Sequence, residues 1–178
     1  MILDRFLTFS LAQSVAIAAG TLASDVIDFG INSGIPTSAN GGGARDMGIG
    51  DSPALKLVVQ PSISFASAAS AGTLTISIQG AVDDGTGNPA AFSTWWVSPI
   101  YTTAQLNAGS RLLDMDFPRP PDGVAVPRYV RLLYTVASAT MTAGTMQAHL
   151  VLDRDDQMYN STDNSIQGGY PAGINVAN

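Results

Sequence analysis

The sequence contains no cysteine and no glutamate, and it has one lysine and one histidine. Without cysteine, the chain has no disulfide, no thiolate metal ligand and no cysteine nucleophile. Glutamate and lysine are common on surface helices, so their scarcity beside 18 glycines and 10 prolines favours a β-rich chain with many turns. A length of 178 residues suffices for one domain, or one domain plus an extension, with a core that needs no cross-link.

Charge is also scarce. Charged residues make up 12% of the chain, against roughly 25% in an ordinary soluble domain. Serine, threonine, alanine and glycine must therefore cover part of the surface. Such a surface favours a protein that packs against others, because few charges are then desolvated on assembly. A secreted β protein with a neutral surface is the alternative. The net charge of −6 argues against direct nucleic-acid binding.

Long apolar runs are missing as well. No stretch approaches the roughly 18 uninterrupted apolar residues of a membrane span, so we expect no transmembrane segment. Residues 1–24 superficially resemble a secretory signal. However, the charges of Asp4 and Arg5 cancel, so the positively charged N-terminal region of a signal peptide is missing, and Gln13 interrupts the apolar run. We therefore expect this region to form the first strands.

Alternation with a period of two is the dominant pattern in the sequence. In residues 73–79 it places Leu74, Ile76 and Ile78 on one face, which predicts a half-buried antiparallel strand. Residues 54–60 form a more continuous apolar run, which predicts a central strand ended by Pro61. Residues 110–117 alternate up to a proline-rich stretch that stops the strand.

The stretch RYVRLLYTV at residues 128–136 holds two arginines inside a predicted strand. One face is apolar throughout, with Val130, Leu132, Tyr134 and Val136. We expect residues 144–153 to pair with it as a hairpin. We expect Arg128 at the entrance of this strand. Arg131 is expected to reach a strand-end aspartate or a backbone carbonyl, so both arginines would fix the sheet rather than bind a ligand.

Strands predicted at residues 13–19, 24–30 and 93–100 bring the total to about eight, which indicates an all-β antiparallel sandwich or jelly roll. The only weak helix candidate is residues 102–109. The predicted organisation is a β-sandwich domain over residues 1–156, which includes a glycine-rich loop at 32–50. A C-terminal arm follows at 157–178, where isolated apolar anchors would wrap a neighbouring subunit.

The sequence offers little for catalysis or metal binding. His149 is the only histidine and no Gly-x-Ser-x-Gly motif accompanies it, so we expect a structural histidine and no catalytic residue. Aspartates cluster at 83–84 and 153–156, where they could supply oxygen ligands to calcium. Both clusters lack EF-hand spacing and follow predicted strands, where polar turns are expected anyway. We therefore expect no metal and no cofactor.

Trp95 and Trp96 are the sharpest candidates for a contact platform. Adjacent residues of a strand point to opposite faces, so one indole should be in the core and the other should face outward. The outward ring would stack on a sugar or pack on a partner subunit. A plain core pair with a loop over the outer ring is the alternative.

Seven stretches, in this order, resemble the capsid cement (decoration) proteins of tailed bacteriophages, in particular the β-sandwich type first described in a Bordetella phage. The chain departs from that pattern in its glycine-rich loop and in the tail after Gln157. The stretches are MILDRFLTFSLAQSVA, SDVIDFG, ARDMGIGDSPALKLVVQ, AGTLTISIQGAVDD, LNAGSRLLDMDF, PRYVRLLYTV and TAGTMQAHLVLDRDDQ.

This resemblance implies a non-enzymatic structural protein of the virion, made in the host cytoplasm and placed on the outside of the icosahedral head. It would bind across neighbouring major capsid protein subunits after expansion and hold the shell against internal pressure. The expected partners are the major capsid protein and further copies of the chain, as a homodimer or homotrimer, with no nucleic acid or membrane. Intermolecular contacts are expected at Trp95, Trp96, Tyr159, Tyr170 and Ile174 and in the glycine-rich loop.

The rival hypothesis is a carbohydrate-binding module, because RYVRL also resembles a late core strand of galactose-binding-like sandwiches. A sugar module should show a concave site with an exposed tryptophan or tyrosine flanked by Asp, Asn or Arg. A cement protein should show flat apolar faces and arms without a partner in their own chain. A β-sandwich hydrolase would need a partner for His149, and the sequence shows none.

Overall fold

The computed structural model describes residues 7–29, 55–120, 127–151, 158–160 and 165–167. Strands account for nearly all of its regular structure, with two short 3₁₀ turns, η2 (Ala68–Ser70) and η3 (Thr103–Gln105). None of the helical turns in the described part is long and apolar enough to cross a membrane. The strands are β1 (Thr8–Ser14), β2 (Gly20–Ala23), β3 (Ile27–Asp28), β4 (Lys56–Ser67), β5 (Thr73–Ala81), β6 (Ser93–Val97), β7 (Tyr101–Thr102), β8 (Leu113–Asp116), β9 (Tyr129–Ala137), β10 (Met141–Val151), β11 (Met158–Asn160) and β12 (Ser165–Gln167).

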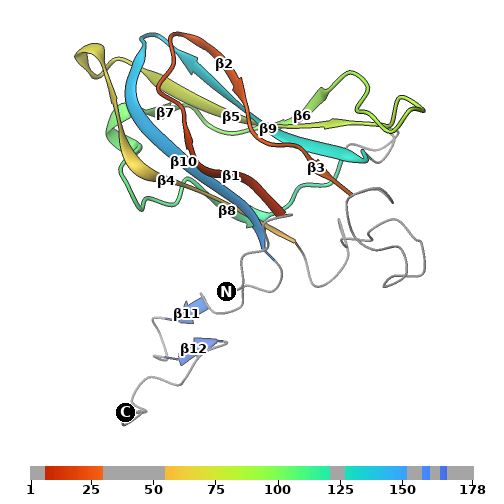
Figure 1. The fold of residues 1–178 in the computed structure, drawn as a ribbon. Coiled ribbons are helices and arrows are strands. Elements are labelled where there is room, and N and C mark those ends of the chain that lie inside the picture. Colours follow the sequence, from red (N-terminus) through yellow and green to blue (C-terminus); the bar gives the residue numbers. More distant parts are fainter. Residues whose placement is uncertain (1–6, 30–54, 121–126, 152–157, 161–164, 168–178) are drawn as a thin grey trace.

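Two antiparallel sheets face each other (Figure 1). One has four strands in the order β1-β10-β4-β8. The other follows the order β2-β9-β5-β6, with β3 also paired to β9 and β7 also paired to β5. The predicted all-β sandwich is therefore confirmed. The two sheets hold ten strands, compared with the expected total of about eight.

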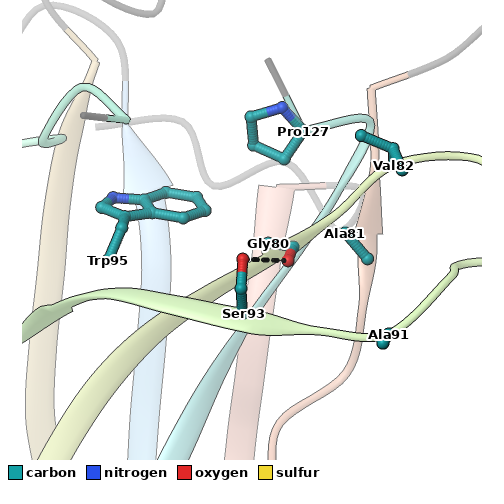
Figure 2. A pocket seen from close by; sticks show the side chains of 7 residues that line it. All are labelled: Gly80, Ala81, Val82, Ala91, Ser93, Trp95 and Pro127. Atoms are coloured by element: carbon teal, nitrogen blue, oxygen red, sulfur yellow. Dashed lines mark hydrogen bonds between the residues drawn. The ribbon is translucent and has the colours of Figure 1, made fainter. Parts of the chain in front are cut away.

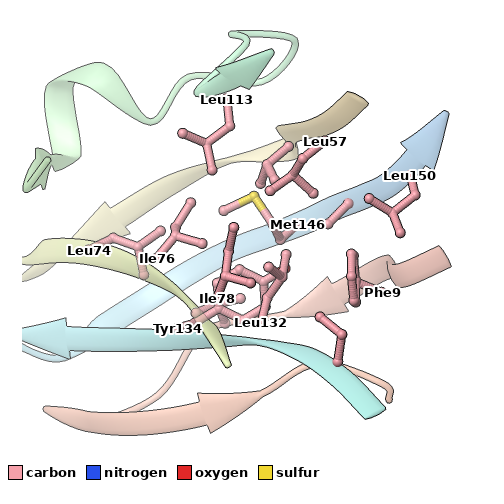
Figure 3. Close-up of a cluster of buried hydrophobic side chains, with 14 of the residues drawn as sticks. Phe9, Leu57, Leu74, Ile76, Ile78, Leu113, Leu132, Tyr134, Met146 and Leu150 are labelled. Atoms are coloured by element: carbon pink, nitrogen blue, oxygen red, sulfur yellow. The ribbon is translucent and has the colours of Figure 1, made fainter. Parts of the chain in front are cut away.

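The core lies between the sheets and follows from the alternation of the two central strands (Figure 3). Leu74, Ile76 and Ile78 of β5 are fully buried, as the alternation predicted. The apolar face of β9 is buried beside them and meets Leu57 and Met146 of the opposite sheet. Burying a side chain of this size contributes about 1.5–3 kcal/mol relative to leaving it exposed. The apolar side chains at every second position of these strands thus form one continuous layer between the sheets.

The predicted hairpin between the strands at 128–136 and 144–153 is wrong. Within the described residues, β9 pairs with β2, β3 and β5, whereas β10 pairs with β1 and β4 in the other sheet. The short turn between them crosses from one sheet to the other, and Ser138 in that turn adopts a positive φ of 67°. The connection therefore closes one end of the sandwich, and β9 and β10 do not pair with each other.

Two strand boundaries also differ from expectation. Strand β4 continues through Pro61 to Ser67. Proline is tolerated there because the register with β10 shifts next to the Pro61–Met146 pair, so the ladder is already irregular at this point. The expected strand at 13–19 is instead the end of β1 followed by a turn into β2. The weak helix candidate at 102–109 is confirmed only as the single turn η3, which has a capping box between Thr102 and Gln105.

Strands β11 and β12 form a separate two-stranded antiparallel sheet beyond the sandwich (Figure 1). They fall in the predicted C-terminal arm, where the sequence showed no periodicity. The glycine-rich loop at 32–50 and most of the arm lie outside the described residues. The division into a domain at 1–156 and an arm at 157–178 stays a prediction.

Candidate functional site

The two adjacent tryptophans do not point to opposite faces of the sheet. Strand β6 pairs Trp96 with Ile78 and Thr94 with Gln79, so the register shifts and Trp95 is an extra residue between the two pairs. A bulge of this kind breaks the alternation of side chains. Both indoles are partly buried and pack against the core. The expected outward-facing ring is therefore absent from this position, and the alternative of a plain core pair is the better description.

Trp95 has a tightly fitted environment. Its ring meets Phe117 edge to face, with 6.1 Å between ring centroids and 88° between planes. Its six-membered ring lies against Gly80, where an added Cβ would overlap both the indole and Pro127. Its buried Nε1 lacks a hydrogen-bond partner within the described residues. Because such an orphaned donor is costly, the packing of the ring must hold Trp95 in place.

A small open pocket lies beside Trp95 (Figure 2). Its lining contains no charged side chain, and its volume is about 110 Å³. Ligand pockets usually measure about 300–1,000 Å³ and place several polar groups around the ligand. The pocket therefore does not have the features of a sugar site. Its lining residues are Gly80, Ala81, Val82, Ala91, Ser93, Trp95 and Pro127.

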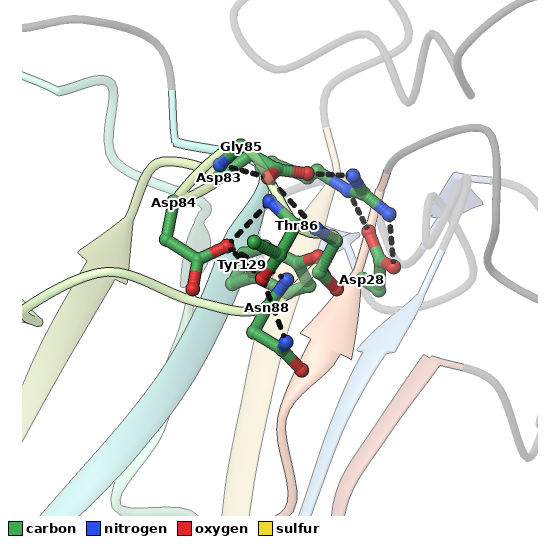
Figure 4. Close-up of polar contacts among 9 residues, drawn as sticks. Asp28, Asp83, Asp84, Gly85, Thr86, Asn88 and Tyr129 are labelled. Carbon is green, nitrogen blue, oxygen red and sulfur yellow. Dashed lines mark hydrogen bonds and ion pairs between the residues drawn. The ribbon is translucent and has the colours of Figure 1, made fainter.

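Asp28, Asp83 and Tyr129 belong to one polar cluster (Figure 4), and Arg128 contacts all three of them. Its Nε and Nη2 donate to the two carboxylate oxygens of Asp28 at 2.9 and 3.0 Å, and its Nη1 donates to Asp83. The guanidinium also lies 4.8 Å from the ring centroid of Tyr129, whose hydroxyl donates to the carbonyl of Gly87. Hydrogen bonding to Asp28 is the main reason that the pKa of Arg128 lies above its ordinary value. The cluster joins β3, β9 and the turn after β5.

The aspartates of that turn are used within the turn itself. Asp83 Oδ1 accepts from the backbone amides of Gly85 and Gly87, and Asp84 Oδ1 accepts from Thr86 and Asn88. These hydrogen bonds are the leading reasons that the pKa values of both carboxyl groups lie below the ordinary value. The arrangement is the polar turn that the sequence predicted. Among the described residues, no cluster of three acidic or histidine side chains could hold a metal ion; residues 153–156 lie outside them.

The two arginines of RYVRLLYTV lie directly before β9 and within it, and Arg131 has a different partner from the one expected. Arg131 donates through Nε to Gln79 at 2.9 Å, and its guanidinium carbon lies 3.9 Å from the ring centroid of Phe92. The prediction that it reaches an aspartate or a backbone carbonyl is therefore wrong. The prediction that Arg128 lies at the entrance of the strand is confirmed, and Arg128 forms ion pairs with Asp28 and Asp83 there. Both arginines link strands, as the structural interpretation of RYVRLLYTV predicted.

His149 lies in β10 and is almost fully buried. Its Nδ1 makes a 3.0 Å hydrogen bond with the hydroxyl of Thr8 on β1. Burial holds the pKa of the imidazole below its ordinary value, so the ring is neutral near pH 7. The described surroundings thus give His149 a strand-linking contact, in keeping with the structural role expected from the sequence.

All of the predicted intermolecular contacts stay predictions, including those at Trp95 and Trp96. Tyr159 lies in β11, and Tyr170, Ile174 and the glycine-rich loop lie outside the described residues. Among the described residues, four large apolar side chains are more than half exposed. The sequence did not single them out, because exposure depends on neighbours that are distant in the chain. They are Leu11, Ile63, Val97 and Ile100, at 68%, 56%, 54% and 67% exposure.

Comparison with protein families gives a match over most of the sandwich. The family model described as Bbp16 matches residues 9–150, which includes every strand of the two main sheets except for the last residue of β10 and the first of β1. No curated protein matches the chain.

Proposed function

The chain belongs to the Bbp16 family, a family of Bordetella phage proteins, and from this premise we propose that it is a capsid cement protein. In this role it binds the outer surface of the phage head across neighbouring major capsid protein subunits and stabilises the expanded shell. The family match over residues 9–150 is the observation that carries the proposal. The resemblance of its ordered sequence stretches to cement proteins supports the specific role.

The surface of the protein supports the same proposal. Exposed apolar side chains such as Ile63 and Ile100 lie among small neutral residues, so an extended contact desolvates few charges. A cement protein adds buried area at many symmetry-related places on one shell. A net gain on the order of a few kcal/mol per copy becomes large when it is multiplied over the shell.

We propose a non-enzymatic role for the chain. His149 is engaged with Thr8, and the aspartates at 83 and 84 are engaged in their own turn and with Arg128. These contacts give each group a structural task. The role requires no cofactor and involves no nucleic acid or membrane; its partners are the major capsid protein and further copies of the chain, as a homodimer or homotrimer.

The carbohydrate-binding alternative fits the geometry less well. It requires an exposed aromatic ring flanked by polar groups in a concave site. Both tryptophans pack against the core, and the pocket beside Trp95 has no charged lining. Arg128 and Arg131 have intramolecular partners. Galactose-type sugars should therefore give no saturable binding in calorimetry, and micromolar binding would favour this alternative.

The direct test mixes the purified protein with expanded, undecorated heads of the parent phage and measures bound copies per shell. We expect saturation at a fixed number of copies and a higher temperature of head disruption. Absence of saturable binding would refute the cement role.

The same assay tests the predicted arm contacts. Replacing Tyr170 and Ile174 together by alanine should weaken head binding while the melting temperature of the free protein stays almost unchanged. A large fall in melting temperature would show that these side chains stabilise the fold instead.

A further inference from the structure

One end of the sandwich is formed by segments that contain no charged residue. We call this surface, made of residues 14–20, 62–73, 97–110 and 137–145, the neutral end. The segments are far apart in the chain, and together they supply the turns on one side of both sheets. In Figure 1 this end carries η2 and β7. The sequence alone gives no sign that these uncharged stretches meet.

Contacts between backbone and side chains hold the four segments together. Met141 donates its amide to the carbonyl of Ile17 at 2.9 Å, and Phe65 donates to Leu106 at 2.9 Å. The hydroxyl of Thr103 donates to the carbonyl of Gly72 at 2.8 Å. Gly144 packs directly on the ring of Phe65, which leaves no room for a side chain at that position. The neutral end is thus a preorganised surface, and binding it costs little ordering.

The charged residues of the described part lie in the rest of the sandwich. The Arg128 cluster with Asp28 and Asp83 is at the opposite end, where β3, β5 and β9 meet. The Lys56–Asp116 pair is also there, at the start of β4. The Arg111–Asp114 pair begins directly after residue 110, so it borders the neutral end. The neutral end itself carries no charge, and the other pairs lie in the opposite half.

The composition of the neutral end suits contact with protein. Its exposed residues are mostly alanine, serine, threonine and glycine, together with three exposed apolar side chains, Ile63, Val97 and Ile100. The cores of protein interfaces are depleted in charge for the same reason, because a charge buried there without a partner is costly. Nucleic acid and anionic lipid bind through cationic side chains, and this surface has none.

We propose that the neutral end is the face that the protein presents to the outer surface of the capsid shell. This inference rests on the proposed function and names the part of the molecule that makes the contact. With the neutral end on the shell, the charged half faces solvent and keeps the surface of the particle charged. A contact between two copies through their neutral ends would instead leave only charged halves to meet the shell. The shell is therefore the occupant that the charge distribution favours.

The test inserts one charge at a time at the neutral end. Ala104 in η3 and Ala66 in β4 are exposed alanines of two different segments. Each is replaced by aspartate and, separately, by lysine. Ala91, which is also exposed but lies in the charged half, receives the same two changes as the matched control. The measurement is the dissociation constant for expanded, undecorated heads, with the melting temperature of each free variant as the check on folding.

We expect both signs of charge at Ala104 and at Ala66 to weaken head binding about tenfold or more, because each leaves a charge desolvated without a partner. The Ala91 variants should bind within about twofold of the parent, since their charge stays in solvent. Equal weakening by aspartate and lysine separates desolvation from long-range attraction, which would shift the affinity in opposite directions.

Three outcomes would overturn the inference in recognisable ways. If the parent protein binds no heads, the proposed function fails and the inference fails with it. If the parent binds and the variants at Ala104 and Ala66 bind equally well, the function stands and the assignment of the neutral end is wrong. If those variants lower the sedimentation coefficient of the free protein and leave head binding unchanged, the neutral end is a contact between copies.

Discussion

A buried hydrogen bond between the two sheets gives the sharpest test of the packing. Tyr134 of β9 is fully buried, and its hydroxyl lies 2.9 Å from Oγ of Ser10 on β1. Ser10 in turn donates to Oε1 of Gln13 at 2.6 Å. Since the single hydroxyl hydrogen of Ser10 is used for Gln13, Tyr134 is the donor to Ser10.

Removing either partner breaks the same hydrogen bond, but the expected loss in the free energy of unfolding differs between the two variants. Tyr134→Phe leaves Ser10 bonded to Gln13, so we expect the net value of one hydrogen bond, about 0.5–1.5 kcal/mol. Ser10→Ala leaves the hydroxyl of Tyr134 buried without an acceptor, which costs about 1–3 kcal/mol. In the Ser10→Ala background, the orphaned hydroxyl is already a penalty. Adding Tyr134→Phe to that background should therefore cost nothing or restore stability.

Urea denaturation of the parent, both single variants and the double variant measures the four free energies of unfolding. Equal m-values would show that the unfolded states are comparable. For a chain of this length, 1 kcal/mol corresponds to a change of roughly 2–4 °C in melting temperature. If Tyr134→Phe costs as much in the Ser10→Ala background as in the parent, the hydrogen bond is not the source of the loss and the reasoning fails.

The same tyrosine predicts a pH dependence. Burial raises the pKa of Tyr134 above its ordinary value of 10.0. Above about pH 10 the unfolded chain therefore loses this proton while the folded chain retains it. The stabilising contribution is complete below that pH and is lost as the pH rises further. The difference in unfolding free energy between the parent and Tyr134→Phe should shrink or reverse above pH 10, and a difference that stays constant would contradict the buried, protonated state.

Two further predictions concern the free energy of unfolding, one at Gly144 and one at His149, both in β10. Gly144 has a φ of +132° and packs on Phe65, so Gly144→Ala should lower the free energy of unfolding by about 2 kcal/mol or more. Gly109→Ala, where φ is +79° and the space is open, should cost only about 1 kcal/mol, and equal costs would show that the Phe65 contact is unimportant. Burial lowers the pKa of His149 from 6.5, so the parent should lose stability as the pH falls below that value, because the unfolded chain takes up the proton first. His149→Gln should flatten urea-derived stability between about pH 7.5 and pH 5, and an unchanged slope would place the titrating group elsewhere.

Local pattern was enough to predict the core faces of the strands. The alternation around Leu74, Ile76 and Ile78 identifies the buried face of β5 without knowledge of its neighbours, because side chains of any extended strand alternate. Pairing was harder to predict. The short turn around Ser138 is compatible with a hairpin and with a crossing between sheets, and only the partners of β9 and β10 decide between them.

The candidate site shows the same limit. The register shift that brings both tryptophans onto the core depends on how β6 meets β5, and the sequence of β6 carries no sign of it. The sequence placed Arg128 at a strand entrance, but its partners Asp28 and Asp83 lie 100 and 45 residues away along the chain. Long-range contacts of this kind are set by topology, so composition and periodicity cannot predict them.

Topology also determines where the few charged residues of this protein lie on its surface. The same 12% of charged residues, scattered evenly over the sandwich, would leave no extended surface free of charge, and every large contact would have to desolvate some of them. The fold instead brings four uncharged stretches to one end and collects the Arg128 cluster and the Lys56–Asp116 pair in the other half. The proposed binding face therefore rests on the placement of charge. Moving one added charge from Ala91 to Ala104 holds the composition constant and changes only this placement, so a difference in head binding between the two variants isolates it.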